Sequence, residues 1–215
     1  MRYKIATATA SARATGGQIY FSPTKTIHAF TASDTFAITP TWSPTATCEI
    51  VVIGGGGGGG SDTGPGASGG GGGAGGAGES TASPNYNVGG DGGTGTALPS
   101  TFQQPGYPIG SPTWYVAGGG GGGGGYAPTS TPNAGGEGGS GVGGDGGHRP
   151  ATPGFTRVTV SGVDGMIMTG SGGGGGSVAP GPLPAPQTGT YADASGEYAW
   201  GGNGGSGIVL IAYPT

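Results

Sequence analysis

Charged residues are scarce in this chain, and their scarcity excludes several classes of protein. Of 215 residues, six are lysine or arginine and ten are aspartate or glutamate, which gives a net charge of −4. A nucleic-acid-binding protein concentrates its basic side chains in one patch, and six dispersed residues do not make one. Highly charged disordered chains have a different composition. We therefore expect no nucleic-acid partner.

Cysteine and long apolar runs are also lacking. Cys48 is the single cysteine, so neither an intrachain disulfide nor a cysteine-based metal cluster can form. We expect Cys48 to be a small buried strand residue. No apolar stretch approaches the ~20 residues that cross a bilayer, so membrane insertion is not expected. Residues 1–15 lack the apolar segment of a secretory signal.

Glycine, in contrast, supplies 60 of the 215 residues, and proline another 18. Glycine-rich runs recur along the chain after Ile53. They occupy residues 54–60, 69–78, 89–95, 118–125, 135–147, 172–176 and 201–207. The segments between them are too short to fold as separate domains, which usually need ~40 residues or more. Two alternatives follow: either the chain after Ile53 is disordered, or the runs pack on one another.

A period of three favours packing. The stretches GGAGGAG, GGDGGTG, GGEGGSG and GGNGGSG place a non-glycine residue at every third position. Three residues per turn is the period of the polyproline-II helix, which makes no internal hydrogen bonds. Its backbone groups must find partners in neighbouring segments, and the lack of a Cβ lets glycine backbones approach closely. We expect a bundle of polyglycine-II helices whose non-glycine side chains point outward.

Short β-strands are expected at both ends of this bundle. QIYF, TIHAF, DTFAIT and CEIVVI precede the first run, and IVLIAY follows the last. Their apolar and β-branched composition is typical of a small sheet. We predict that residues 48–53 and 208–213 are adjacent strands. The expected fold class is mainly irregular and β, a small β-sheet base plus a packed polyglycine-II bundle, with essentially no α-helix.

Three stretches together carry a resemblance to a known family: TIHAFTASDTFAI, EIVVIGGGGGGG and GGNGGSGIVLIAY. Over roughly residues 26–213, the chain resembles the glycine-rich domain of bacteriophage tail and fibre proteins, which includes the polyglycine-II sandwich adhesins. The resemblance implies a virion protein on a tail fibre or another exterior appendage. It also implies that loops at one end of the bundle bind a bacterial surface protein or glycan.

The resemblance and the strand pattern together suggest a division of the chain. Residues 1–53 would form an N-terminal attachment segment, which contacts other virion or fibre proteins, and the β base. Residues 54–207 would form the bundle with its recognition loops, and residues 208–215 the closing strand of the base.

Each extended segment that runs from one end of the expected bundle to the other is here termed a pass. The number of passes predicts which loops lie far from the base. The first run leaves the base and the last returns to it, so this number should be even. Seven runs and the proline-rich segment 180–186 would give eight passes. This count places 61–68, 97–115, 149–168 and 187–198 at the far end, and 79–88 and 127–134 next to the base.

Aromatic side chains gather in the connections expected at the far end. Their rings offer large contact surfaces of the kind that recognition sites use. The candidate receptor-binding residues are Phe102, Tyr107, Trp114, Tyr115, Phe155, Tyr191, Tyr198 and Trp200. The alternative is that these rings cap the ends of the bundle, and Trp114 and Trp200, beside glycine runs, fit that role best.

Catalytic patterns are poor, and we do not expect an enzyme. Ser68 lies in a G-x-S-x-G match, but such matches arise by chance at this glycine content and no strand-to-helix context surrounds it. No GK[ST] follows a glycine run, so a phosphate-binding loop is not expected. Asp145 and His148 are too few to hold a metal. His28 is expected to be a packed or half-exposed strand residue. We expect no cofactor and no metal.

Three functions stay open at this point. The first is a viral adhesin or fibre component. The second is a structural glycine-rich filament or capsid-decoration protein without a receptor. The third is an ice-binding bundle, against which the acidic residues of the outer face and the long aromatic loops argue. The oligomeric state is open too, from a monomer to a homo-oligomer.

Overall fold

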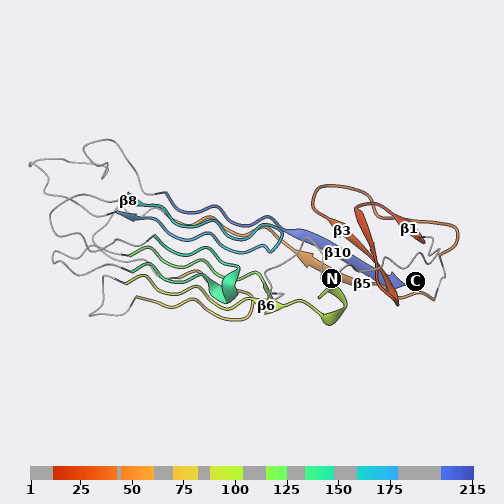
Figure 1. Ribbon diagram of the computed structural model, residues 1–215, viewed down its shortest axis with the longest axis horizontal. Coiled ribbons are helices and arrows are strands. Elements are labelled where there is room, and N and C mark those ends of the chain that lie inside the picture. The colour runs from red at the N-terminus through yellow and green to blue at the C-terminus, as the bar shows by residue number, and fades with distance from the viewer. Residues whose placement is uncertain are drawn as a thin grey trace, which may run out of the picture.

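The structure, a computed structural model, describes residues 12–42, 45–60, 70–81, 88–103, 115–124, 134–147, 159–178 and 200–215. These residues are mostly short β-strands and irregular segments, and they contain no α-helix. Figure 1 shows a β-sheet at one end and long glycine-rich segments that run side by side from it to the other end. The expectation of a mainly β and irregular chain is confirmed.

A four-stranded antiparallel sheet, here termed the base sheet, has the strand order β2–β3–β10–β5. Its strands are β2 (Gln18–Phe21), β3 (Lys25–Phe30), β5 (Glu49–Ile53) and β10 (Ile208–Pro214). β10 lies between β3 and β5, with Ile208 opposite Ile53 and Ala212 opposite Glu49. The predicted adjacency of the strands that flank the glycine-rich region is confirmed.

The other strands are short antiparallel pairs. β1 (Ala14–Thr15) pairs with β4 (Ala37–Ile38), β6 (Thr96–Ala97) with β7 (Tyr115–Val116), and β8 (Thr159–Val160) with β9 (Ser177–Val178). Single 3-10 turns occupy Ser100–Phe102 (η1) and Gly139–Gly141 (η2).

The apolar core lies on one face of the base sheet. Side chains along a strand alternate between its two faces, so every second residue of β3 and β10 points to this side. The core contains Ile27, Ala29, Leu98, Phe102, Val116, Ile208, Leu210 and Ala212. Leu98 and Phe102 come from residues 96–103 and Val116 comes from β7, so these two segments cover this face. We term it the covered face, and the opposite face, with His28, Val209 and Ile211, the open face.

Beyond the base sheet, the chain runs back and forth in extended passes (Figure 1). They comprise residues 54–60, 70–73, 77–81, 88–95, 118–124, 134–139, 143–147, 159–166, 171–178 and 200–207. The predicted number of eight is wrong. The runs 69–78 and 135–147 each turn back on themselves, through Gly73 and Gly76 in one case and η2 in the other. The proline-rich segment 180–186 lies outside the described residues.

The pass 118–124 lies at the centre of this arrangement, and its hydrogen bonds repeat every three residues. Its N–H groups donate to carbonyl oxygens at 2.8–3.1 Å in the pairs Gly119–Gly93, Gly122–Gly90, Gly121–Gly144 and Gly124–Gly147. Its carbonyl oxygens accept from the N–H groups of Gly172, Gly175, Gly139, Gly136 and Gly71. Five neighbouring passes are thus joined to one central pass through backbone atoms, and the hydroxyl groups of Ser171 and Ser177 add bonds to Gly118 and Gly124.

Side chains on the passes lie outside, as the three-residue period predicts. The third positions Asp91, Thr94, Glu137, Asn203 and Ser206 are exposed. Glycines between them, such as Gly93, Gly136 and Gly205, are buried. The interior of the passes therefore consists mostly of backbone, and Ser171 and Ser177 are buried exceptions.

Glycine is required where two passes touch. A Cβ atom on Gly121 would lie 2.0 Å from the carbonyl oxygen of Gly136, and one on Gly119 would lie 1.9 Å from that of Gly71. Gly57, in contrast, has no atom within 4 Å of such a Cβ. The same substitution should therefore have opposite consequences at different glycines.

Replacing Gly121 with alanine should prevent folding or lower the melting temperature sharply, because the methyl group would overlap a carbonyl oxygen of fixed backbone. Gly72→Ala should leave stability unchanged or raise it by about 0.4–1 kcal/mol, since no atom lies within 4 Å of a Cβ at Gly72 and alanine restricts the unfolded chain. Thermal unfolding followed by circular dichroism compares the two variants. Equal melting temperatures would contradict the close packing of passes.

Candidate functional site

The connections between passes lie differently from the prediction. Residues 96–103 and 115–116 lie next to the base sheet, because Leu98, Phe102 and Val116 pack in the core. The chain then leaves the base sheet along 118–124 and returns along 134–139, so the first of these passes ends, and the second begins, at the end away from the sheet. In the same way, the pass 77–81 ends and the pass 88–95 begins at that end. The prediction was wrong because two runs that it counted as single passes each form two.

Phe102 belongs to the core and is not a recognition residue. Its side chain is 1% exposed and packs with Leu98 and Val116 against the covered face. The base sheet needs an apolar cover on this side, and the 3-10 turn η1 directs the ring into it. The prediction that Phe102 binds a receptor is therefore wrong.

Two further candidates lie at opposite ends of the described structure. Trp200 is 66% exposed and begins the last pass, where its carbonyl oxygen accepts from the N–H of Gly162 near β8. Tyr115 is in β7, next to the core residue Val116. The structure therefore does not bring Trp200 and Tyr115 together. The candidates Tyr107, Trp114, Phe155, Tyr191 and Tyr198 lie outside the described residues.

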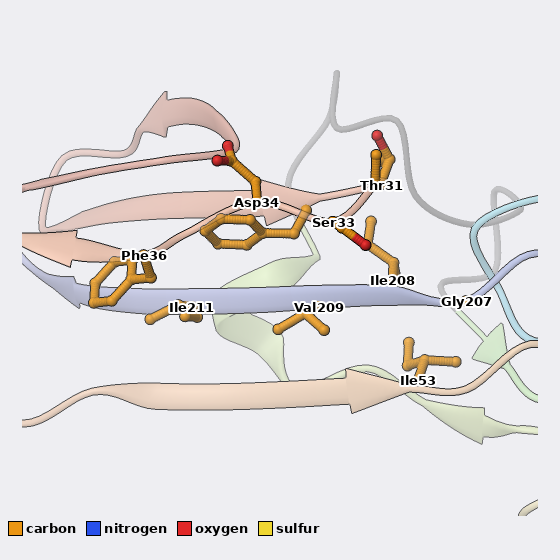
Figure 2. Close-up of a pocket in the computed structure, with 11 residues that line it drawn as sticks. Thr31, Ser33, Asp34, Phe36, Ile53, Gly207, Ile208, Val209 and Ile211 are labelled. Atoms are coloured by element: carbon orange, nitrogen blue, oxygen red, sulfur yellow. The ribbon is translucent and has the colours of Figure 1, made fainter.

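Sequence reasoning missed a groove of about 430 Å³ on the open face of the base sheet (Figure 2). Val209 and Ile211 of β10 line it, together with Phe30 at the end of β3 and Phe36 in the segment that follows. Ser33 and Asp34 add polar atoms. The alternation of β10 gave a weak signal, because it sends apolar side chains to both faces. On this face Phe36 and Trp42 pack on His28 and Tyr213, while Val209 remains half-buried at the groove.

A buried hydrogen-bond chain supports this side of the base sheet. Nδ1 of His28 lies 2.6 Å from the carbonyl oxygen of Gly16, and Nε2 lies 3.1 Å from the hydroxyl of Tyr213. A carbonyl oxygen only accepts, so Nδ1 carries the proton and Nε2 accepts from the hydroxyl. That hydroxyl also accepts from the backbone N–H groups of Arg13 and Ala14. The prediction that His28 is a packed strand residue is confirmed.

Aromatic contacts fix the segment that borders the groove. Phe36 packs edge-on against His28 at 5.2 Å and against Trp42 at 6.1 Å between ring centroids. Trp42 in turn lies 4.8 Å from Tyr213. These geometries are ones that aromatic pairs favour. The groove wall is therefore anchored to the same strand that forms its floor.

Asp34 ties this wall to the turn before β2. Its carboxylate accepts 2.7 Å hydrogen bonds from the backbone N–H groups of Gly17 and Thr35. These bonds, the one from Gly17 foremost, lower the pKa of Asp34. Gly17 has φ +62°, a conformation that glycine adopts without strain.

The groove lining offers contact surface for binding but few side chains that could take part in a reaction. Asp34 is the one ionisable side chain among its lining residues, and both of its oxygens already accept hydrogen bonds. Within the described ranges, no group of three or more histidine, cysteine, aspartate or glutamate residues could hold a metal ion. No helix in that part of the chain is long and apolar enough to cross a membrane.

Carboxylates on the passes form hydrogen bonds to neighbouring passes. The Oδ1 atoms of Asp91, Asp145 and Asp164 accept hydrogen bonds of 2.7 Å from backbone N–H groups of neighbouring passes. An acidic third position can therefore bridge to the next pass. Cys48 is exposed just before β5, so the expectation that it is buried is wrong.

Comparison with known proteins found no matching family model, no matching curated protein and no matching solved structure.

The burial of Phe102 predicts that Phe102→Ala lowers the free energy of unfolding by about 3–5 kcal/mol, because it empties a core site. Trp200→Ala, at an exposed position, should change it by no more than ~0.5 kcal/mol. Urea unfolding of the two variants and the wild type measures both values. A Phe102→Ala variant as stable as Trp200→Ala would remove Phe102 from the core.

Proposed function

We propose that the passes form a polyglycine-II bundle. The three-residue repeat of hydrogen bonds around pass 118–124 supports this, because three residues make one turn of that helix. Gly138, within a pass, has φ −71° and ψ 137°, close to polyproline-II values. Among the described glycines, positive φ values occur at Gly16, Gly17, Gly141 and Gly170, which lie in turns.

The proposed helix predicts uniform backbone angles through the central pass. In an experimental structure, residues 118–124 should have φ near about −75° and ψ near about +145°. Crystallography or NMR with backbone chemical shifts and couplings can measure these angles. Values near φ −140° for this pass would indicate an ordinary β-sheet arrangement instead.

We propose further that the chain is a bacteriophage virion protein, a tail-fibre or fibre-tip adhesin without enzymatic activity. The observation that carries this proposal is the pairing of passes at the end away from the base sheet. Each connection there begins and ends on a pass that hydrogen bonds to its neighbours. Such anchoring lowers the entropy lost when a loop binds a partner. The sequence resemblance to phage glycine-rich domains supports the same assignment.

The proposed recognition surface is built from residues at that end. Trp200 begins the last pass at that end, and the proposed surface would add Phe155, Tyr191 and Tyr198. In the sequence, Phe155 lies between the passes 143–147 and 159–166, and Tyr191 and Tyr198 lie between the passes 171–178 and 200–207. Their rings would stack on a bacterial surface glycan or contact an exposed protein loop. The other end, with residues 1–53, would attach to further virion or fibre proteins.

A structural protein without a receptor is the second candidate. The observation in its favour is that Phe102 and Tyr115 lie at the base sheet, which leaves fewer aromatic rings at the other end. Exposed Asp91 and Glu137 on the passes argue against the flat face of small residues that an ice-binding bundle needs.

The adhesin proposal predicts that Trp200→Ala and Phe155→Ala each reduce binding of a fluorescent fusion protein to host cells while the melting temperature stays close to that of the wild type. Tyr115→Ala is the matched control, an aromatic residue near the base sheet, and should bind normally. Flow cytometry over a panel of bacterial strains measures binding. Equal binding by all three variants would favour the structural protein.

A further inference from the structure

β5 is an edge strand of the base sheet with an exposed apolar side. In the described part of the chain it pairs with β10 alone, and the register of that pairing is unbroken. Ile50 is 58% exposed and Val52 is 71% exposed. Edge strands are usually protected by lysine, proline, a bulge or a covering segment, because their free N–H and C=O groups recruit other strands. The sequence Glu49–Ile53 has no lysine or proline.

We propose that β5 pairs antiparallel with β5 of a second copy of this chain, about a twofold axis at Val51. In this register Ile50 lies opposite Val52 of the second copy, and Glu49 lies opposite Ile53. The exposed apolar residues cover one another, and no like charges face each other. Directly opposed residues of this kind stabilise antiparallel pairs. The strand is thus complementary to itself.

The residues next to β5 fit the same register. Antiparallel pairing about Val51 places residues 54–57 opposite residues 48–45 of the second copy, so glycines face Cys48, Thr47, Ala46 and Thr45. All four opposing side chains are small. No atom lies within 4 Å of a Cβ built on Gly54 or on Gly57. A neighbouring backbone can therefore approach the first pass without a clash.

This pairing also accounts for glycine where the isolated fold does not need it. The exposed third positions of other passes hold side chains, such as Thr94 and Ser206. Gly54 and Gly57 occupy comparable exposed positions yet carry none, although glycine costs conformational entropy there. A second chain that packs against this pass gives a physical reason for both glycines.

The dimer would join the grooves of the two copies. Val52 pairs with Val209 and Ile50 with Ile211, and these residues of β10 line the groove. Across the twofold axis the two apolar strips would become one, within a continuous sheet formed by both base sheets. The passes of the two copies would extend in opposite directions. The proposal does not depend on receptor binding.

Two lysine variants test the interface. Ile50→Lys/Val52→Lys should weaken self-association by about 100-fold or more, because each lysine would face another lysine across the axis. Ile38→Lys is the matched control, since Ile38 is 61% exposed but lies in β4. Sedimentation velocity over a concentration series measures the mass. Wild type and Ile38→Lys should be dimers, and the double variant should be a monomer that keeps the wild-type circular-dichroism spectrum and still unfolds cooperatively.

A disulfide experiment tests the register and does not depend on the lysine variants. A chain with Ile50→Cys and a chain with Val52→Cys, both also carrying Cys48→Ser, are mixed under mild oxidation. Opposed Cα atoms in an antiparallel pair lie ~4.5–5.5 Å apart, within reach of a disulfide. The mixed pair should therefore cross-link, and an Ile38→Cys chain mixed with the Val52→Cys chain should not. A monomeric wild type, a dimer unaffected by the lysines, or absence of the mixed cross-link would overturn the proposal.

Discussion

Close approach of glycine backbones is the constraint on which the rest of the structure depends. Where passes touch, a carbonyl oxygen of one occupies the place that a Cβ of the next would take, as at Gly121 and Gly136. Apolar side chains are thereby excluded from the interior of the passes. Stability must come from backbone hydrogen bonds of ~0.5–1.5 kcal/mol each, against an entropic cost of ~0.5–1 kcal/mol for each ordered glycine. The passes can hold together only if most of these bonds form at once.

The base sheet supplies what the passes lack. β5 runs directly into the first pass and β10 receives the last, so antiparallel pairing of these two strands fixes both ends of the glycine-rich region. The apolar side chains that are absent from the passes gather here, with Phe102 and Leu98 as the cover. Turns between passes also reach the core: Met168, which has φ +60° in the turn before Gly170, packs against it. The sheet thus limits the conformational freedom of glycine-rich segments that have little conformational preference of their own.

Sequence patterns predicted the parts of the fold that depend on side chains. The apolar runs located β5 and β10, and the period of three located the outward residues. The turns at Gly73 and at Gly139–Gly141 were not predictable, because glycine adopts extended and turned conformations equally well. A glycine run therefore does not show where the chain changes from one conformation to the other. The pass 159–166 was missed because it is not a glycine run, although Gly162 and Gly165 stand where a Cβ would clash. The role of Phe102 was predicted wrongly, because the sequence around an aromatic residue in a connection is the same whether its ring covers a core or binds a partner.

The same constraint limits where this chain can evolve function. A change inside the passes adds a Cβ against a carbonyl oxygen, so variation is confined to third positions, connections and the open parts of the base sheet. Asp91, Asp145 and Asp164 use third positions to accept hydrogen bonds from the next pass. The exposed side of β5 and the groove beside β10 remain open, because Phe36 and Trp42 cover His28 and Tyr213 on that face but leave Ile50 and Val52 exposed. Rigid passes between two variable ends let each end acquire its own partner without altering the other.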